Sequence, residues 1–436
     1  MNLLKLIGLA LLSSTLLSCA DFFNPKTAAK SGDVIVGTVT GNNAFDADFD
    51  PTSAPFSKEK MLAGIGLQVI FPKVKELRLQ LENLQIEIEN LRQELEEDKV
   101  GVESEKEVLK RWRLAMLAFH QADSFGVGPL SENGALIADQ IYSWPAFDPC
   151  GLDLQVAELS NTGKASVALV SSVKGLAALE YLFFEPTMAA PRCKPRNVAH
   201  RPAFDWAAKD IKVKKLDRVR YAEAITFDAL EAARVLEAAW NPRAGNYSKT
   251  LIDGSRYPDV IQATNAMSDS LFAIESVKDI RLGKPLGLHK DCAEPGSLET
   301  CPESTEHEWS GLGLKAVEAR LLGFQAAFLG QRSKGSKIYG FDDYLQNVGR
   351  GEIAEALAKE VAQALKSVKE VDSLGDIRAQ IEGMDPQQCA DTGVENRLVP
   401  VCALFQDVRA ISTRLKTEFL IALGLQAPAQ FQGDND

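Results

Sequence analysis

The sequence predicts an all-α protein, and two observations lead to this fold class. Apolar residues recur at three- and four-residue intervals over most of the chain beyond residue 58, which is the spacing of one face of an α-helix. The alternation of single apolar and polar residues that is typical of strands is nearly absent. Helices without strands must pack against each other, so we expect helical bundles.

A long helical pattern runs from Met61 to Met116. Its apolar positions alternate spacings of four and three, as in a coiled coil; they are Leu77, Leu81, Leu84, Ile88, Leu91 and Leu95. Because Val100 to Val102 interrupts this seam, a helix packed within the chain is favoured over dimerisation with a partner. A second helix contains Trp112 and Phe119 and stops at Gly126-Val127-Gly128-Pro129.

After a Pro- and Gly-rich passage that includes Trp144-Pro145, the helical pattern resumes and continues nearly to the end of the chain. The expected helices cover residues 167–184, 216–240, 261–282, 312–329, 342–347, 352–374 and 401–425. Loops with the last four cysteines separate the later helices. The chain exceeds the size of one usual core, so two domains or a large repeat are expected.

The beginning of the sequence has the layout of a secretory signal peptide. Lys5 precedes an apolar run from Leu6 to Leu12, and small and polar residues then lead to Ser18-Cys19. The run is too short to remain as a membrane-spanning helix. Its ending resembles a bacterial lipobox, so we expect a signal peptide over residues 1–18 and acylation of Cys19. Plain cleavage near Ala20, with loss of Cys19, is the alternative.

Acylation of Cys19 would make the membrane a partner through the lipid anchor, because several acyl chains are enough for stable attachment. Residues 19–57, rich in Gly, Pro, Thr and Asp, are expected to form the lipid-anchored tether. This places the protein on the periplasmic side of the cell envelope. The outer membrane is preferred, because Ala20 rather than an Asp follows the anchor cysteine.

Cysteine usage agrees with export. Without Cys19, six of the seven cysteines remain, and an even number suits an oxidising compartment. Short loops favour the pairs Cys292 with Cys301 and Cys389 with Cys402, which leaves Cys150 for Cys193. Free buried thiols are the alternative, and no cysteine and histidine spacing indicates a zinc site.

The formal charge of the chain is -12, and the mature chain without Lys5 carries one positive charge fewer. Nucleic acid is therefore excluded as a partner, because no basic stripe is available to meet phosphates. An acidic surface is common among soluble proteins, and it would also tolerate cationic ligands or metal ions.

Several motifs together resemble the imelysin-like family of predicted periplasmic lipoproteins. Trp112 to Phe119, with Asp123 and Gly128-Pro129, is similar to the early helix of the family, and Ser143-Trp144-Pro145 is similar to its Trp-Pro turn. Gly175-Leu176-Ala177-Ala178-Leu179-Glu180-Tyr181-Leu182 is similar to the signature helix. Later segments at residues 220–240 and 281–286 also fit, so the resemblance covers roughly residues 61–425.

The resemblance implies two related helical bundles that arose by duplication, which we place at residues 58–245 and 246–428. Members of the family reside in bacterial envelopes and are often linked to iron uptake, and some are classed as metallopeptidases. Envelope metal-uptake proteins are therefore possible partners.

The family signature Gly-x-His-x-x-Glu is incomplete in this chain, because Ala177 occupies the position of the histidine. A His and a Glu three residues apart share one helical face and can hold a metal or activate water. With Ala177 the pair is broken, which argues against an inherited peptidase activity. Glu180 lies among apolar residues and needs a partner; pairing with an Arg is favoured over a surviving role as a metal ligand.

A replacement metal site is a further hypothesis. His120 and Asp123 are three residues apart on one expected helix, and they would join Glu180 if that helix packs beside the signature helix. One imidazole and two carboxylates suit a divalent ion such as iron, zinc or manganese. Chance spacing of a His and an Asp on an exposed face is the alternative.

Other candidate motifs are weaker. Glu303, Glu306, His307 and Glu308 precede an expected helix and are interpreted as a solvated helix cap rather than a metal centre. Asp46, Asp48 and Asp50 lack the rest of a calcium loop and are assigned to the tether. Residues 330–337 do not match a phosphate loop.

These observations predict a lipid-anchored envelope protein that acts as a non-enzymatic binding component in iron or other metal acquisition. A metallopeptidase is the main alternative, and it is disfavoured by Ala177. A structural or partner-binding lipoprotein is the third possibility. The cofactor, if there is one, would be a divalent metal ion such as iron or zinc.

Overall fold

The chain folds as an all-helical protein, which confirms the expected fold class. The structure is a computed structural model that describes residues 55–99, 102–165, 170–185, 188, 191–290, 292, 299–330, 338–390 and 397–428. Cys19, the expected signal peptide, the three tether aspartates and most of residues 330–337 lie outside these ranges. The described part contains no β-strand, and one isolated β-bridge joins Tyr142 to Gly175.

The longest helical segment begins at Lys58, where the side chain of Ser57 accepts a hydrogen bond from the backbone N–H of Lys60. It consists of α2 (Lys58–Ile65), a π-helical segment (Gly66–Ile70) and α3 (Phe71–Glu96). Five of the six seam residues of α3 are buried, and Leu95 is half-buried against the same core. The seam therefore packs within the chain, as expected from its interruption.

Helix α9 (Ile211–Trp240) packs antiparallel to α3, and ion pairs fix their register. Arg78 pairs with Glu237 at 2.6 Å near one end of α3, and Glu96 pairs with Arg220 at 3.0 Å near the other. Arg92 and Glu223 pair between them at 2.6 Å. These partly exposed pairs select an alignment more than they add stability.

Further helices complete this half of the described chain: α4 (Val102–Asp123), α5 (Glu132–Ile141), α6 (Pro149–Thr162), α7 (Gly175–Phe184), α8 (Arg201–Ala207) and α10 (Tyr247–Thr250). Helix α4 packs on α3, and α7 packs on both α4 and α9. The helices α5 and α6 occupy the Pro- and Gly-rich passage in which no helix was expected. Pro149 at the first position of α6 starts that helix rather than breaking it.

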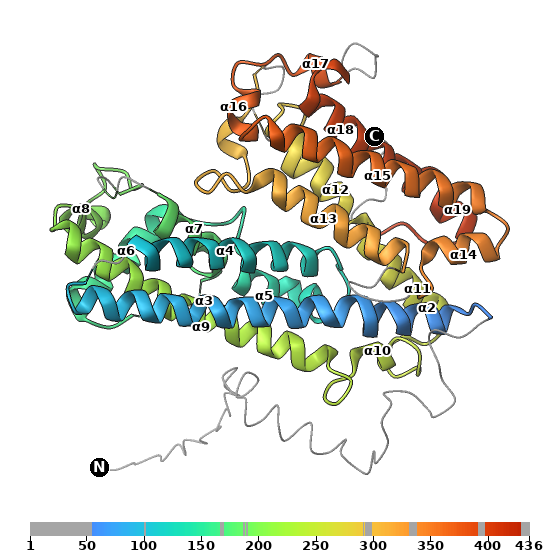
Figure 1. The fold of residues 1–436 in the computed structure, drawn as a ribbon, viewed down its shortest axis with the longest axis horizontal. Helices are drawn as coiled ribbons and strands as arrows, with labels where there is room; N and C mark the ends of the chain where they lie inside the picture. Colours follow the sequence, from blue (N-terminus) through green and yellow to red (C-terminus); the bar gives the residue numbers. More distant parts are fainter. Residues whose placement is uncertain are drawn as a thin grey trace, which may run out of the picture. The chain divides into compact units, whose positions relative to one another are not determined.

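The remaining helices are α11 (Val260–Asp269), α12 (Ala273–Ser276), α13 (Gly313–Phe328), α14 (Phe341–Asn347), α15 (Gly351–Ser373), α16 (Ile377–Ile381), α17 (Gln387–Ala390), α18 (Pro400–Arg414) and α19 (Leu420–Leu423). A π-helical segment follows α12 (Val277–Gly283), and another separates α18 from α19 (Leu415–Phe419). Helix α15 packs against α13 and α18, which lie beside it in Figure 1.

The two groups of helices meet where α4 packs against α13. Gly323 of α13 lies so close to Ser124 that a Cβ atom on it would be 2.5 Å from the Ser124 side chain, so a glycine is needed for this approach. Buried apolar residues of both groups form one continuous cluster. All described residues belong to one compact unit, and the boundary near residue 245 stays a prediction.

The described cysteines form disulfides that join Cys150 to Cys193, Cys292 to Cys301 and Cys389 to Cys402. These are the pairs that the short-loop argument favours. Among the described residues, no helix has the length and apolar character needed to cross a membrane.

Candidate functional site

The segment that precedes α13 carries Glu306 and His307 into the interior of the protein. Glu306 is 2% exposed and His307 is 3% exposed, so the interpretation as a solvated helix cap is wrong for these two residues, whereas Glu303 is exposed. His307 has a φ angle of +64°, a left-handed conformation that is uncommon outside glycine and often marks functional sites. The surrounding helices, rather than the local sequence, determine where these side chains lie.

His307 connects two helices of the other half of the chain. Its Nδ1 lies 2.8 Å from Oε2 of Glu180 on α7, and its Nε2 lies 2.8 Å from Nε2 of His120 on α4. The other carboxylate oxygen of Glu180 accepts hydrogen bonds from the backbone N–H and the hydroxyl of Ser310, at 3.0 and 2.9 Å. The result is a buried chain of polar groups that runs from Glu180 through His307 to His120.

Aromatic rings enclose the two imidazoles. The ring of Tyr142 stacks on His307 with centroids 5.6 Å apart, and Trp112 contacts His307 edge-on at 5.7 Å. The indole N–H of Trp112 donates to the backbone carbonyl of Leu176 at 2.9 Å, which ties α4 to the first turn of α7. The packing thereby fixes the helix that carries His120 relative to the helix that carries Glu180.

Glu306 is surrounded by donors and positive charge. Its carboxylate accepts hydrogen bonds from the Tyr142 hydroxyl at 3.1 Å and from Arg320 of α13 at 3.1 and 3.3 Å, and Arg281 approaches to 3.2 Å. Burial alone would raise the pKa of Glu306, but Arg281 and Arg320 outweigh it and hold this pKa at about 2. Glu306 is therefore ionised at all physiological pH values.

His120 is neutral at physiological pH. Complete burial, reinforced by the nearby charge of Arg320, lowers the pKa of this imidazole well below its usual value. The Nδ1 atom of His120 is buried and has no hydrogen-bond partner in the described structure. Nδ1 of His120 is therefore the imidazole nitrogen of the cluster that has no described hydrogen bond.

The residues predicted from sequence are only partly brought together. His120 and Glu180 lie on either side of His307, whereas Asp123 is ion-paired with Arg320 at 3.5 Å and is partly exposed. The expected Arg partner of Glu180 is absent from its described hydrogen bonds, which come from His307 and Ser310. No sequence pattern marks Tyr142 or Arg320 as a site residue, and Arg281 is marked only as part of residues 281–286, which resemble the family.

The donor atoms fit a divalent metal ion. One ligand atom each of His120, Glu306 and His307 lie within 4.8 Å of one another, and all three residues are buried. Imidazole and carboxylate are suitable ligands for zinc, iron and manganese. A metal-ligating histidine commonly donates its second ring N–H to a carboxylate, and Glu180 occupies this position beside His307.

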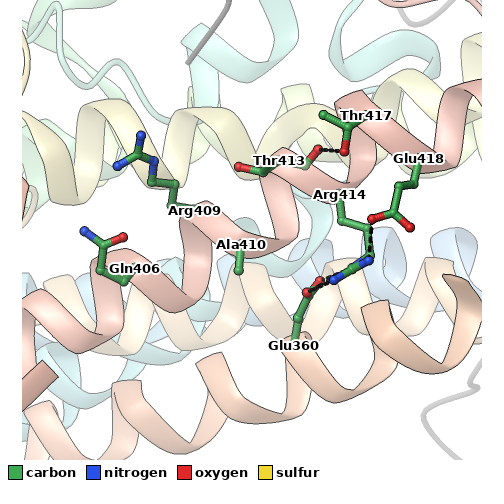
Figure 2. Close-up of a pocket in the computed structure, with 8 residues that line it drawn as sticks. All are labelled: Glu360, Gln406, Arg409, Ala410, Thr413, Arg414, Thr417 and Glu418. Carbon is green, nitrogen blue, oxygen red and sulfur yellow. Dashed lines mark hydrogen bonds and ion pairs between the residues drawn. The ribbon is translucent and has the colours of Figure 1, made fainter. Parts of the chain in front are cut away.

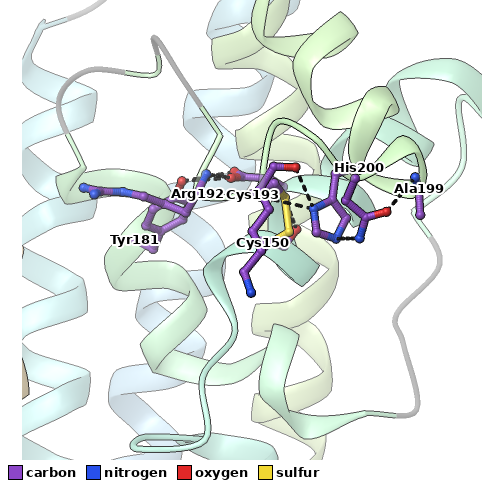
Figure 3. The surroundings of a disulfide bond; sticks show 9 residues. Cys150, Tyr181, Arg192, Cys193, Ala199 and His200 are labelled. Carbon is purple, nitrogen blue, oxygen red and sulfur yellow. Dashed lines mark hydrogen bonds between the residues drawn. A yellow bond between two sulfur atoms is a disulfide. The ribbon is translucent and has the colours of Figure 1, made fainter.

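Two other features are weaker candidates. Cys150, Cys193 and His200 also lie within 4.8 Å of one another, but both sulfurs belong to a disulfide, as Figure 3 shows. An open pocket of about 350 Å³ lies along α18, where Arg414 pairs with Glu360 and Glu418 (Figure 2). It shares no residue with the histidine cluster.

Comparison with known proteins identifies the family. The imelysin family model matches residues 79–399, which is well over half of the chain. This chain belongs to the imelysin family. No curated protein sequence gives a significant match.

Two solved structures share the imelysin fold of this chain. One is an imelysin-like protein from Psychrobacter arcticum 273-4, with a TM-score of 0.55 and 15% identity over 86% of this chain and 99% of that protein. The other is described as an iron-regulated protein A precursor from Parabacteroides distasonis ATCC 8503, with the same TM-score and identity over 86% of this chain and 100% of that one.

The incomplete signature of this imelysin lies at the start of α7. Gly175 has a φ angle of +75°, and a Cβ atom there would be 2.7 Å from the carbonyl oxygen of Ile141, so only glycine fits. Ala177 is buried and offers no ligand atom. The imidazole that meets the signature glutamate, Glu180, comes instead from His307 in the other half of the chain.

Proposed function

We propose that this imelysin is an exported, lipid-anchored protein that binds a divalent metal ion. It would act as a non-enzymatic binding component in the acquisition of iron or another metal. The observation that carries the proposal is the buried chain from Glu180 through His307 to His120, with Glu306 alongside. His120, His307 and Glu306 would hold the ion. Glu180 would orient the ring of His307 through its hydrogen bond to Nδ1.

The hydrogen bond between Glu180 and His307 gives a physical reason for this assignment of roles. An ionised carboxylate accepts, so Nδ1 of His307 must donate, which leaves the lone pair of a neutral ring on Nε2. This nitrogen faces His120. Because metal binding requires neutral imidazoles, the lowered pKa of His120 favours binding at neutral pH.

Asp123 is assigned a supporting role in this proposal. It pairs with Arg320, and Arg320 in turn contacts Glu306. The charges of Arg281 and Arg320 offset that of Glu306, so the buried site tolerates this ionised carboxylate before any ion binds. Asp123 therefore acts on the site through Arg320 rather than as a ligand.

The link to iron rests on family likeness. Imelysin-like proteins are often connected with iron uptake, and one of the solved structures with this fold is described as iron-regulated. Zinc and manganese are the other candidates for the same donor set. Envelope metal-uptake proteins are the partners that such a binding component would serve.

Export and lipid anchoring are supported by the layout of residues 1–19 and by the pairing of the six other cysteines in disulfides, which persist in oxidising compartments. Mass spectrometry of the mature N-terminus tests this part. We expect an acylated Cys19 as the first residue, and an unmodified chain that starts at Ala20 or later would contradict it.

A binding role is preferred over peptide hydrolysis because the signature carboxylate is fully engaged. Glu180 accepts hydrogen bonds from His307 and from both donors of Ser310, so it is not placed to activate a water molecule. A peptide-hydrolysis assay with added zinc, iron or manganese is expected to show no cleavage. Metal-dependent cleavage that is lost in Glu180→Gln would establish a metallopeptidase instead.

A further inference from the structure

A loop of residues 192–201, here called the basic loop, concentrates positive charge in an acidic protein. The chain carries a formal charge of -12. In contrast, the stretch of residues 191–215, which includes the basic loop and the start of α9, carries a formal charge of +6. Their cations are Arg192, Lys194, Arg196, Arg201, Lys209, Lys212, Lys214 and Lys215, and their anions are Asp205 and Asp210. Such a local reversal of sign indicates a binding surface for an anionic partner.

The lysines that follow the basic loop are used within the protein. Lys212 pairs with Asp98 and Lys215 with Glu105, both at 2.8 Å, while Lys214 donates to two backbone carbonyls. In contrast, Lys194 and Arg196 are exposed and form no ion pair among the described residues. Arg201 has only a 3.7 Å contact with Asp205, and both side chains are largely exposed.

The basic loop is held rigidly. The Cys150–Cys193 disulfide joins it to α6, and the backbone N–H of Arg192 donates to the buried carboxylate of Asp153 at 2.8 Å. The ring of His200 accepts from the backbone N–H of Lys194 at 3.1 Å and contacts the amide of Asn197. A rigid loop presents its charges without an ordering cost on binding.

Val198 lies within the basic loop and is 86% exposed. An exposed aliphatic side chain among cations is suited to the boundary between lipid headgroups and acyl chains. We propose that the basic loop docks on an anionic membrane surface, with Lys194, Arg196 and Arg201 facing the headgroup phosphates.

The position of the loop agrees with docking of a tethered protein. Phe56 and α2 lie at one end of the long α2–α3 segment, and the ion pair between Asp98 and Lys212 places the start of α9, next to α8, at the other end (Figure 1). A helical segment of this length spans about 58 Å. The chain from Cys19 to Ser57 reaches at most about 130 Å, so an anchor at Cys19 permits this orientation.

Only the orientation relies on the proposed anchor, and the docking surface is independent of the metal site. The test uses residues 20–436 without acyl chains, because residues 55–428 form every contact described above. Its binding is measured by co-sedimentation with vesicles that contain phosphatidylglycerol and with vesicles of phosphatidylcholine alone. The test variant is Lys194→Gln/Arg196→Gln/Arg201→Gln, and the matched control is Lys359→Gln/Lys366→Gln/Lys369→Gln on α15, which removes the same charge elsewhere.

We expect the wild type and the α15 control to bind only the phosphatidylglycerol vesicles, with binding that weakens in high salt. The basic-loop variant is expected to bind about 100-fold more weakly, since each cation near an anionic surface contributes about 5-fold. Val198→Asp should weaken binding as well.

Equal loss in both triple variants, equal binding to both vesicle types, or no vesicle binding would overturn the proposal. Binding to polyglutamate but not to vesicles would assign the surface to an acidic protein, and would also overturn it.

Discussion

Nδ1 of His307 lies 2.8 Å from Oε2 of Glu180, although 127 positions separate the two residues in the sequence. The family signature would place an imidazole one turn before this glutamate, at the position of Ala177. In this chain the imidazole arrives from the segment before α13, so the contact also joins the two groups of helices. The pair should therefore matter to both the stability of the fold and the geometry of the site.

The first prediction concerns the coupling between these two residues. Glu180→Ala, His307→Ala and the double variant should show a coupling energy of about 2 kcal/mol in urea unfolding, because each single change leaves a buried polar partner without its hydrogen bond. Free energies of unfolding that simply add, to within about 0.5 kcal/mol, would show that the two side chains do not interact in solution.

The second prediction concerns Arg320, which is 5% exposed and pairs with Glu306. Arg320→Met should lower the free energy of unfolding by about 3 kcal/mol, because it leaves much of the charge of Glu306 buried without compensation. Arg414→Met is the matched control, since Arg414 forms its ion pairs at a partly exposed position. It should cost about 1 kcal/mol or less, and equal costs for the two variants would contradict the buried network.

The third prediction is a pH dependence at Asp269, the last residue of α11. Burial raises the pKa of this carboxyl to about 6, and it forms no hydrogen bond or ion pair among the described residues. A pKa raised above the unfolded value means that the folded state favours the protonated form. The resulting penalty is therefore absent below about pH 4, grows between pH 4 and 6, and is complete above pH 6.

Asp269→Asn should accordingly stabilise the protein at pH 7 to 8 by about 1 kcal/mol, a value reduced from the full shift because the side chain is partly exposed. The gain should shrink as the pH falls toward 4. Urea unfolding of both proteins across this range checks it, and a gain that stays the same at every pH would rule out the titration of Asp269 as its cause.

The fourth prediction ranks two disulfides. Cys150 and Cys193 are 43 residues apart, whereas Cys292 and Cys301 are 9 apart. Because a longer loop loses more entropy on closure, replacing the first pair by serines should cost about 4 kcal/mol and replacing the second about 3 kcal/mol. Non-reducing peptide mapping should first show the native pairs, and free thiols or cross-pairing in the map would contradict the structure.

Much of the helical fold could be predicted from residue spacing, because a helix with one buried face has apolar residues at three- and four-residue intervals. The seam of α3 from Leu77 to Leu91 is an example, since each of its apolar positions is buried. Helices α5 and α6 left no such signal. Pro149 begins α6 within a Pro- and Gly-rich passage, and residues 133–135 adopt left-handed backbone angles inside the span of α5.

The candidate site was predictable only in part, because its members meet through tertiary packing. Glu180 is an acid in an apolar helix, and His120 is three residues from Asp123, yet nothing in the sequence joins either of them to His307. The acids around His307 have the same composition as an ordinary helix cap, and only burial distinguishes the two. No sequence signal connects Arg281 or Arg320 with Glu306, and only the structure shows that both arginines contact this carboxylate.

The most direct test of the central claim is isothermal titration calorimetry of the mature protein with zinc, manganese and, without oxygen, ferrous iron. The four histidines of the chain provide the variants: His120→Ala and His307→Ala change the cluster, and His200→Ala is the matched control. We expect one divalent ion to bind at neutral pH, with binding retained in His200→Ala and abolished in both cluster variants. Undiminished binding in His120→Ala and His307→Ala, or no binding of any of the three ions by the wild type, would contradict a metal-binding role for this site.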